Sequence, residues 1–227
     1  MQHIVYKNNI KQCNVNIDHV YHDLETKGYS LFNVGKINKD EFLEFCYNFG
    51  EVIPSGRQKP MIDDIFINDG TGTAKLPFHT DKSYWRLPPR YEILYVNDVY
   101  NMNYGEITVS SIVDAFNALT PNEQQELIQL SSAYKSPSNR DAGENPCANF
   151  VNFVDGKIEF FRYRLDIFNS NHPAIKKMAD FIEDHHVKVK YSKADILILD
   201  NWKYAAGRNI TEWGENGFRH LYRALLV

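Results

Sequence analysis

The segment of this sequence that could do chemistry most directly is LPFHTDKSYW, residues 76–85, which holds a histidine and an aspartate two positions apart. If a β-strand ends here, His79 and Asp81 point to the same side, because alternate residues of a strand share a face. An imidazole nitrogen and a carboxylate oxygen on one side supply two of the three ligands of the two-histidine, one-carboxylate site that holds iron(II). A His-x-Asp pair alone is a weak indication, since histidines near aspartates are common on protein surfaces.

The residues that follow this pair add further blocks in a fixed order. The aromatic Tyr84-Trp85 comes first, then a Pro-Pro turn at residues 88–89 and the β-like run YEILYVNDV. A Tyr-Gly-Glu-Ile-Thr strand at residues 104–108 leads into the helical pattern SSIVDAFNAL. The C-terminal stretch LDNWKYAAGRNITEWGENGFRHLYRALLV contains Asp-Asn at 200–201, Gly-Arg at 207–208 and two arginines, Arg219 and Arg223. The joint pattern is far more specific than any single block.

Over about residues 50–227, these blocks resemble the TauD/clavaminate-synthase-like family of iron(II)/2-oxoglutarate-dependent oxygenases. The resemblance implies that His79 and Asp81 are catalytic residues and metal ligands, and that Fe(II), 2-oxoglutarate and O2 are the cofactors. It also implies a double-stranded β-helix, the jelly-roll or cupin-like barrel. The expected reaction is a hydroxylation, desaturation or cyclisation, and the sequence does not choose among these outcomes.

The resemblance gives the two C-terminal arginines a role at the cosubstrate. In the family, an arginine on the last core strand holds the distal carboxylate of 2-oxoglutarate. Arg219 lies 13 residues after position 206, which suits that role, and a guanidinium binds a carboxylate through two parallel hydrogen bonds. Arg223, four residues later on the same strand face, is the second cofactor-binding candidate or meets the substrate instead.

The chain departs from the family pattern at two positions. Ala206 stands where the family has its second histidine ligand, and alanine cannot bind a metal. Ile107 stands where the family has the first threonine of the cosubstrate-binding strand. We expect Thr108 to supply the missing hydroxyl as a cofactor-binding residue, although neighbouring strand residues point to opposite faces.

Three explanations of Ala206 compete. The first is an engineered histidine-to-alanine change that silences catalysis, since the Asp-Asn and Gly-Arg blocks around it are intact. The second is a natural two-ligand centre, in which water, halide or substrate takes the open position. The third is a pseudoenzyme that keeps the fold and binds a metabolite without catalysis. We favour the first, because loss of a ligand by drift usually comes with erosion elsewhere.

Short β-rich runs must position these residues, and they dominate the chain after residue 62. We predict strands at about 29–34, 64–68, 91–98, 106–110, 149–154, 158–162, 187–191, 196–200 and 218–227. Helical patterns occur at about 18–26, 111–119, 121–130 and 173–185, and at 38–49 with Asn38 as N-cap and Gly50 at the end. These elements predict a mainly β protein with flanking helices.

The length of 227 residues and a hydrophobic content of 43% suit one sizeable core. We therefore predict a single oxygenase-like domain over residues 1–227. Residues 1–50 form an N-terminal α/β flank, and residues 51–227 form the jelly-roll core. This core carries a helical insert at about 111–130 and a polar, lid-like loop at 136–147.

Composition excludes several other classes of protein. A formal charge of −4 leaves no basic surplus for a nucleic-acid backbone, and no apolar run is long enough to span a membrane. The N-terminus has no signal-peptide pattern, so we predict a soluble, cytoplasmic protein. The three cysteines, Cys13, Cys46 and Cys147, are far apart and outside any CxxC motif, which argues against disulfides or a cysteine metal site.

The substrate is constrained less than the metal site. The resemblance favours a small, amino-acid-like metabolite that bears a carboxylate. Candidate substrate contacts are Tyr84 and Trp85 beside the ligand pair, Arg57 in the loop PSGRQKP, and Arg140 in the long polar loop. Each of the four is equally compatible with a structural role. The sequence does not predict an oligomeric state.

Overall fold

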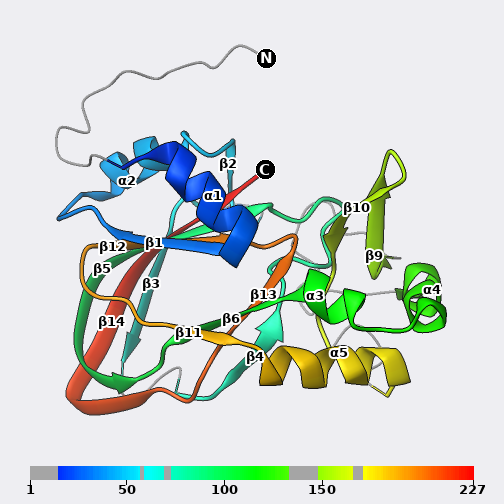
Figure 1. Cartoon of the computed structure of the whole chain (residues 1–227). Coiled ribbons are helices and arrows are strands. Elements are labelled where there is room, and N and C mark those ends of the chain that lie inside the picture. The colour runs from blue at the N-terminus through cyan, green and yellow to red at the C-terminus, as the bar shows by residue number, and fades with distance from the viewer. Residues whose placement is uncertain (1–14, 57–58, 69–72, 133–147, 166–170) are drawn as a thin grey trace.

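Two antiparallel sheets build the core of the computed structural model, which describes residues 15–56, 59–68, 73–132, 148–165 and 171–227 (Figure 1). The larger sheet has the strand order β1-β12-β5-β14-β2, and β3 also pairs with β14. Its strands are β1 (Tyr29–Asn33), β12 (Asp195–Asp200), β5 (Tyr91–Tyr104), β14 (Glu212–Leu226), β2 (Val52–Ile53) and β3 (Asp63–Asn68). The smaller sheet, of order β11-β6-β13-β4, consists of β11 (Val187–Val189), β6 (Ile107–Ser111), β13 (Tyr204–Arg208) and β4 (Leu76–His79). The mainly β class with flanking helices is confirmed.

Alternation along the strands divides each sheet into two faces. In β5, Tyr91, Ile93 and Tyr95 face the N-terminal helices, whereas Glu92 and Leu94 face the smaller sheet. The inner faces of the two sheets share one apolar cluster of buried residues, made by Leu94, Leu197 and Leu199 from the larger sheet and Ile107, Val109 and Val189 from the smaller. The sheets therefore pack face to face, and the space between them is where an inward-facing polar residue must find a partner.

Two helices cover the outer face of the larger sheet. Helix α1 (Ile17–Lys27) starts at the N-cap Asn16 and ends at Gly28, whose φ of 78° a residue with a Cβ would rarely adopt. Helix α2 (Lys39–Cys46) begins at the predicted N-cap Asn38, which forms a capping box with Glu41. It ends earlier than predicted, because the backbone N–H and side chain of Asn48 both bond the carbonyl of Phe45 and close the helix with a tighter turn.

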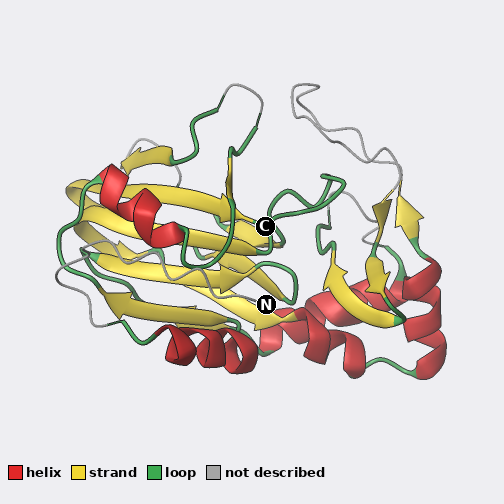
Figure 2. Cartoon of the chain, turned by 90° about the horizontal axis from the view of Figure 1, so that it is seen from above, coloured by secondary structure: helices red, strands yellow, loops and turns green. Residues whose placement is uncertain are grey.

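Three further helices lie at the other end of the molecule (Figures 1 and 2). They are α3 (Ile112–Asn117), α4 (Pro121–Gln129) and α5 (Pro173–Asp184), and they pack on a second apolar cluster with Phe78 of β4 and Ala205 of β13. Two small antiparallel pairs stand beside them: β7 (Ser131–Ser132) with β8 (Ala148–Asn149), and β9 (Val151–Val154) with β10 (Lys157–Phe161). Helices α3 and α4 occupy the interval predicted as a helical insert.

The strand that carries position 206 was not predicted. Strand β13 reads YAAGR, which has little intrinsic β-propensity, but it pairs with β6 on one side and β4 on the other. Tertiary pairing of this kind overrides local preference. No helix within the described ranges is long and apolar enough to cross a membrane.

Candidate active site

A cavity of about 180 Å³ lies between the two sheets and brings together the predicted metal-site positions and both C-terminal arginines. Apolar residues form most of its wall, and two carboxylates, one histidine and three arginines complete it. The described residues that line the cavity are Ile65, Ile67, Leu76, His79, Asp81, Glu92, Leu94, Ile107, Leu199, Asn201, Ala206, Gly207, Arg208, Arg219, Leu221 and Arg223.

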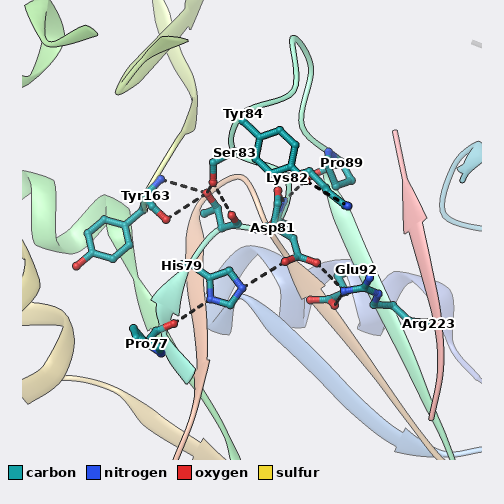
Figure 3. A network of polar contacts seen from close by, with 12 residues as sticks. Pro77, His79, Asp81, Lys82, Ser83, Tyr84, Pro89, Glu92, Tyr163 and Arg223 are labelled. Atoms are coloured by element: carbon teal, nitrogen blue, oxygen red, sulfur yellow. Dashed lines mark hydrogen bonds and ion pairs between the residues drawn. The ribbon is translucent and has the colours of Figure 1, made fainter. Parts of the chain in front are cut away.

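His79 and Asp81 converge at one wall of this cavity (Figure 3). The Nε2 atom of His79 lies 3.3 Å from Oδ1 of Asp81, and its Nδ1 atom lies 2.9 Å from the carbonyl oxygen of Pro77. Nδ1 can donate a proton to that carbonyl, while Nε2 donates its own proton to the Asp81 carboxylate. A metal bound to Nε2 would take the place of that second proton. Burial alone would raise the pKa of Asp81, but the hydrogen bond with His79 and the charge of Arg223 hold it well below its usual range. The pair thus offers a nitrogen and an ionised carboxylate to a cation.

The two side chains converge for a reason that differs from the prediction. Strand β4 ends at His79 and Asp81 begins a turn, so the pair does not share a strand face. Asn201 positions Asp81 instead. Its Oδ1 accepts from the Asp81 N–H at 2.6 Å, and its Nδ2 donates to the carbonyls of Asp81 at 3.1 Å and Pro89 at 2.8 Å. Because one amide side chain binds both backbone groups of Asp81, it fixes the direction of the carboxylate.

Buried contacts on the other side hold the turn itself. The Thr80 N–H donates to the carbonyl of Tyr163 at 2.8 Å, and the Tyr163 N–H donates to Thr80 Oγ1 at 3.1 Å. The buried guanidinium of Arg162 donates to the carbonyls of Ser83 at 2.7 Å and Trp85 at 2.6 Å. Burial lowers the pKa of Arg162 to about 10, which still leaves it charged at neutral pH. The segment that carries Asp81 is therefore rigidly supported.

Ala206 lies opposite His79 in the pairing of β13 with β4, and both residues line the cavity. Directly opposed residues of neighbouring antiparallel strands have Cβ atoms about 5 Å apart. A longer side chain at position 206 would thus reach toward the His79–Asp81 pair. No group of three or more His, Cys, Asp or Glu side chains within the described part of the chain is arranged to hold a metal ion. The site holds the two predicted ligands, His79 and Asp81, and the methyl group of Ala206 lies at the position where the sequence pattern predicts a third.

One end of the cavity, which we call the arginine end, is formed by Arg208, Arg219 and Tyr191. Arg219 is 3% exposed and donates from Nη1 to the Tyr191 hydroxyl at 2.7 Å, and its Nε has no hydrogen-bond partner among the described residues. Burial, and after it the charge of Arg219, lower the pKa of Arg208, so the two cations lie near each other. Two neighbouring guanidinium groups, one buried and one half-buried, favour a bound anion.

The other end, which we call the carboxylate end, is lined by Asp81, Glu92 and Arg223, and Asp63 binds Arg223 from outside the cavity lining. Arg223 donates to Asp63 Oδ2 from Nε at 3.1 Å and Nη2 at 2.7 Å, and to Asp81 Oδ2 from Nη1 at 3.1 Å. Glu92 Oε1 lies 3.6 Å from the same Nη1 (Figure 3). Burial, and after it the charge of Asp81, raise the pKa of Glu92 to about 7. One guanidinium is therefore shared by three carboxylates.

The two arginines of β14 face the same cavity but sit far apart. Arg219 and Arg223 are separated by four residues, which corresponds to about 13 Å along an extended strand. His220, between them, points away and contacts Asn97 at 2.8 Å and Asp64. The predicted inward direction of both arginines is confirmed.

The placement of Thr108 contradicts the prediction made for it. Ile107 lines the cavity, whereas Thr108 does not. Ile107 and Val109 of β6 belong to the inner apolar cluster, so strand alternation turns the side chain of Thr108 to the opposite face. On that face the hydroxyl of Thr108 packs beside Gly207: if Gly207 carried a Cβ atom, the two would lie 3.1 Å apart. Thr108 cannot replace the hydroxyl that Ile107 lacks.

The predicted substrate contacts do not gather at the cavity. Tyr84 and Trp85 are not among the residues that line it; their rings pack on the Lys82 ammonium group, which lies 5.9 Å and 5.3 Å from the two ring centroids. Trp85 is also buried, so its position is that of a core residue beside the turn. Arg57, Arg140 and the lid-like loop at 136–147 lie outside the described residues, as do Cys13 and Cys147. Cys46 is a buried free thiol.

Several polar residues of the site were missed at the level of sequence. Asp63, Glu92 and Tyr191 were assigned no role, although Glu92 carried a signal. In YEILYV it shares the period-two face of Leu94 and Val96, and a glutamate on a buried strand face needs a partner. Asp63 and Tyr191 carried no comparable signal, because only the fold brings them to the arginines of β14.

A two-sheet β-barrel that encloses a His-x-Asp pair and a buried arginine has the architecture of the jelly-roll oxygenases. Residues 6–164 match the sequence profile of the family described as taurine catabolism dioxygenase TauD, TfdA family. The chain belongs to the TauD/TfdA family. The matched range includes the His79–Asp81 pair and ends before β13 and β14, so it does not reach Ala206 or the arginines of β14. No curated protein sequence matched the chain.

Solved structures extend the likeness over nearly the whole chain. An asparagine oxygenase in complex with Fe(II), 3-hydroxyasparagine and succinate aligns with a TM-score of 0.74 at 12% identity, covering 92% of this chain and 78% of that one. PvcB from Pseudomonas aeruginosa aligns at 0.70 and 16%, covering 94% and 80%. The non-heme iron oxygenase OrfP with Fe and alpha-ketoglutaric acid aligns at 0.69 and 17%, covering 93% and 78%. The predicted jelly-roll fold is confirmed.

Proposed function

We propose that this protein binds iron(II) and 2-oxoglutarate to oxidise a small amino-acid-like metabolite, and that Ala206 weakens or silences this activity in the chain as it stands. The observation that carries the proposal is the convergence of His79 and Asp81 on a cavity that also holds the buried Arg219. Family membership supports the oxygenase class. The structurally similar asparagine oxygenase and OrfP, solved with 3-hydroxyasparagine and with L-Arg, support an amino-acid-like substrate.

The donor chemistry of the cavity fits iron(II) in part. His79 Nε2 and Asp81 Oδ1 would hold the ion, and they are nitrogen and oxygen donors of the kind that non-heme iron sites use. When bound with 2-oxoglutarate, iron(II) supplies the activation of O2 that these side chains cannot perform. Asn201 keeps Asp81 oriented, and the leucine and isoleucine wall excludes water.

The arginine end suits the distal carboxylate of 2-oxoglutarate. Arg219 has an unpartnered, buried Nε and lies beside the Tyr191 hydroxyl, so a carboxylate there would receive charge-assisted hydrogen bonds from a fixed donor set. Arg208 adds a second positive charge. Arg223 is less suited to this role, because Asp63 and Asp81 already accept from three of its nitrogens.

Ala206 favours a second candidate, a binding protein that holds the metabolite without turnover. A metal held by His79 and Asp81 alone lacks one protein bond, which water replaces poorly. A natural two-ligand centre, with water, halide or substrate at the open position, would instead turn over in the chain as given. The silenced oxygenase, the two-ligand oxygenase and the non-catalytic binding protein predict different results when succinate formation is measured.

The test restores histidine at position 206. Ala206→His and the parent chain are supplied with Fe(II), 2-oxoglutarate, O2 and candidate amino acids, and succinate is measured. Turnover in Ala206→His alone supports a silenced oxygenase, because position 206 faces His79 across the strand pair. Turnover in the parent supports a two-ligand centre. Silence in both folded proteins supports the binding protein. Ala205→His, on the opposite face of β13, is the matched control and should stay silent.

A further inference from the structure

We infer that Glu92 binds a positively charged group of the substrate, so that the carboxylate end of the cavity selects an ammonium or guanidinium compound. The inference names the substrate class of the proposed oxygenase and rests on that function for the identification of the cavity as the substrate site. It also reverses the simplest expectation for Arg223, which is that this arginine binds the carboxylate of the substrate.

All three nitrogens of the Arg223 guanidinium already donate to a carboxylate. Its Nε and Nη2 both donate to Asp63 Oδ2, and the other oxygen of Asp63 accepts from the Ser55 hydroxyl at 2.7 Å. Its Nη1 donates to Asp81. A substrate carboxylate would have to displace one of these carboxylates from a partly buried ion pair, whose unpaired partner would then carry a large desolvation penalty.

Glu92 is the acidic residue of the carboxylate end that has no cation assigned to it. Asp63 is paired with Arg223, and Asp81 is the proposed metal ligand, so each has a cation assigned to it. Among the residues that the structure describes, the cation nearest to Glu92 is the Nη1 atom of Arg223, at 3.6 Å, and Asp81 already accepts from that atom. Its side chain is 14% exposed and shares the cavity wall with Leu94 and Leu199. A carboxylate among leucines is stabilised by a cation that arrives with the ligand.

The same cavity shows independently that it is built for a ligand. Arg219, 3% exposed, lines the arginine end about 13 Å along β14 from Arg223, and its Nε has no hydrogen-bond partner among the described residues. An anion such as 2-oxoglutarate fits that end and leaves the carboxylate end for the substrate. The cavity therefore distinguishes the two ligands by charge: the anionic cosubstrate binds at the arginine end, and the cationic group of the substrate binds at the carboxylate end.

The test measures binding and needs no turnover. The full-length chain, with 2-oxoglutarate in excess to fill the arginine end, is titrated with n-butylammonium, 1-butanol and butyrate, and binding is followed by ligand-observed NMR. We expect saturable binding of n-butylammonium that weakens about tenfold or more in Glu92→Gln, because a hydrogen bond to a charged group contributes about 1.5–3 kcal/mol. The exposed Glu51→Gln, which makes the same charge change outside the cavity, should bind like the parent. Butanol binding should be equal in all three proteins.

Three results would overturn the inference. The first is n-butylammonium binding that is absent, or equal in the parent and Glu92→Gln. The second is butyrate binding that persists with excess 2-oxoglutarate and disappears in folded Arg223→Gln, which would make Arg223 the residue that binds the anion. The third concerns the metal. Affinities of Glu92→Gln for Mn(II) and 2-oxoglutarate should match the parent; a lost Mn(II) affinity would make Glu92 a metal ligand and also overturn it. Absence of succinate formation in both the parent and Ala206→His would contradict the proposed oxygenase function, and it would leave these binding results unchanged.

Discussion

The two ends of the cavity carry opposite excesses of charge. At the arginine end, Arg208 and Arg219 lie together, and the two carboxylates among the described cavity-lining residues, Asp81 and Glu92, are both at the other end. At the carboxylate end, three acids share the single guanidinium of Arg223. Buried charge without a partner is strongly unfavourable, so each excess predicts the sign of what binds there. The comparison assigns an anion to one end and cations to the other.

The largest effect should come from removing Arg223, the guanidinium that three carboxylates share at the carboxylate end. Arg223→Gln leaves Asp63, Asp81 and Glu92 facing one another in a mostly buried site. Breaking such a network by removing one partner costs about 3–5 kcal/mol, and we expect about 4 kcal/mol of lost unfolding free energy in urea titrations. Divalent metal should restore part of the loss, because it binds the folded state and supplies positive charge.

Arginine and lysine controls sharpen this test. Arg219→Gln should change the unfolding free energy by no more than about 1 kcal/mol. It removes a buried cation, and among the described residues the side chain of Arg219 hydrogen-bonds only the hydroxyl of Tyr191. Lys193→Gln removes an exposed ion pair with Asp98 and should cost less than about 1 kcal/mol. Equal destabilisation by Arg223→Gln and Arg219→Gln would abolish the distinction between the two ends.

The second effect is a dependence of stability on pH that belongs to the carboxylate end. Burial raises the pKa of Glu92 from 4.5 in the unfolded chain to about 7 in the folded one. Between those values the folded state holds a proton that the unfolded state has released, so the unfolding free energy of the metal-free protein falls as pH rises, by up to about 3 kcal/mol. Glu92→Gln should lose this slope and gain stability relative to the parent from pH 5 to pH 8. Parallel stability curves would contradict the prediction.

The sequence predicted the His79–Asp81 pair and the two arginines of β14 as site residues for a physical reason. His79, Asp81, Arg219 and Arg223 belong to blocks whose order and spacing resemble a family, and strand alternation places both arginines on one face. The same alternation argument correctly cast doubt on Thr108, which the structure turns away from the cavity. Local rules therefore predicted which residues of β14 face inward.

Local rules could not predict contacts that depend on pairing across the chain. Asp63 reaches Arg223 because β3 pairs with β14, and Asn201 reaches the backbone of Asp81 across 120 positions of sequence. Strand β13 forms from weak β-formers because β4 and β6 flank it. The charge balance of the cavity, which separates its two ends, arises from these long-range contacts.

The smallest effect tests the arginine end by itself. Arg219→Gln removes the charged donor proposed to hold the distal carboxylate of 2-oxoglutarate, and we expect the dissociation constant to rise about a hundredfold in calorimetric titrations, equivalent to about 2.7 kcal/mol. Arg219→Lys keeps the charge and loses the planar fork, so its loss should be smaller, about tenfold. Arg223→Gln, measured under conditions where it is folded, should bind 2-oxoglutarate like the parent, because Asp63 and Asp81 occupy that guanidinium. If Arg219→Gln binds normally while Arg223→Gln does not, the anion sits among the carboxylates, and the charge excess at each end does not predict its ligand.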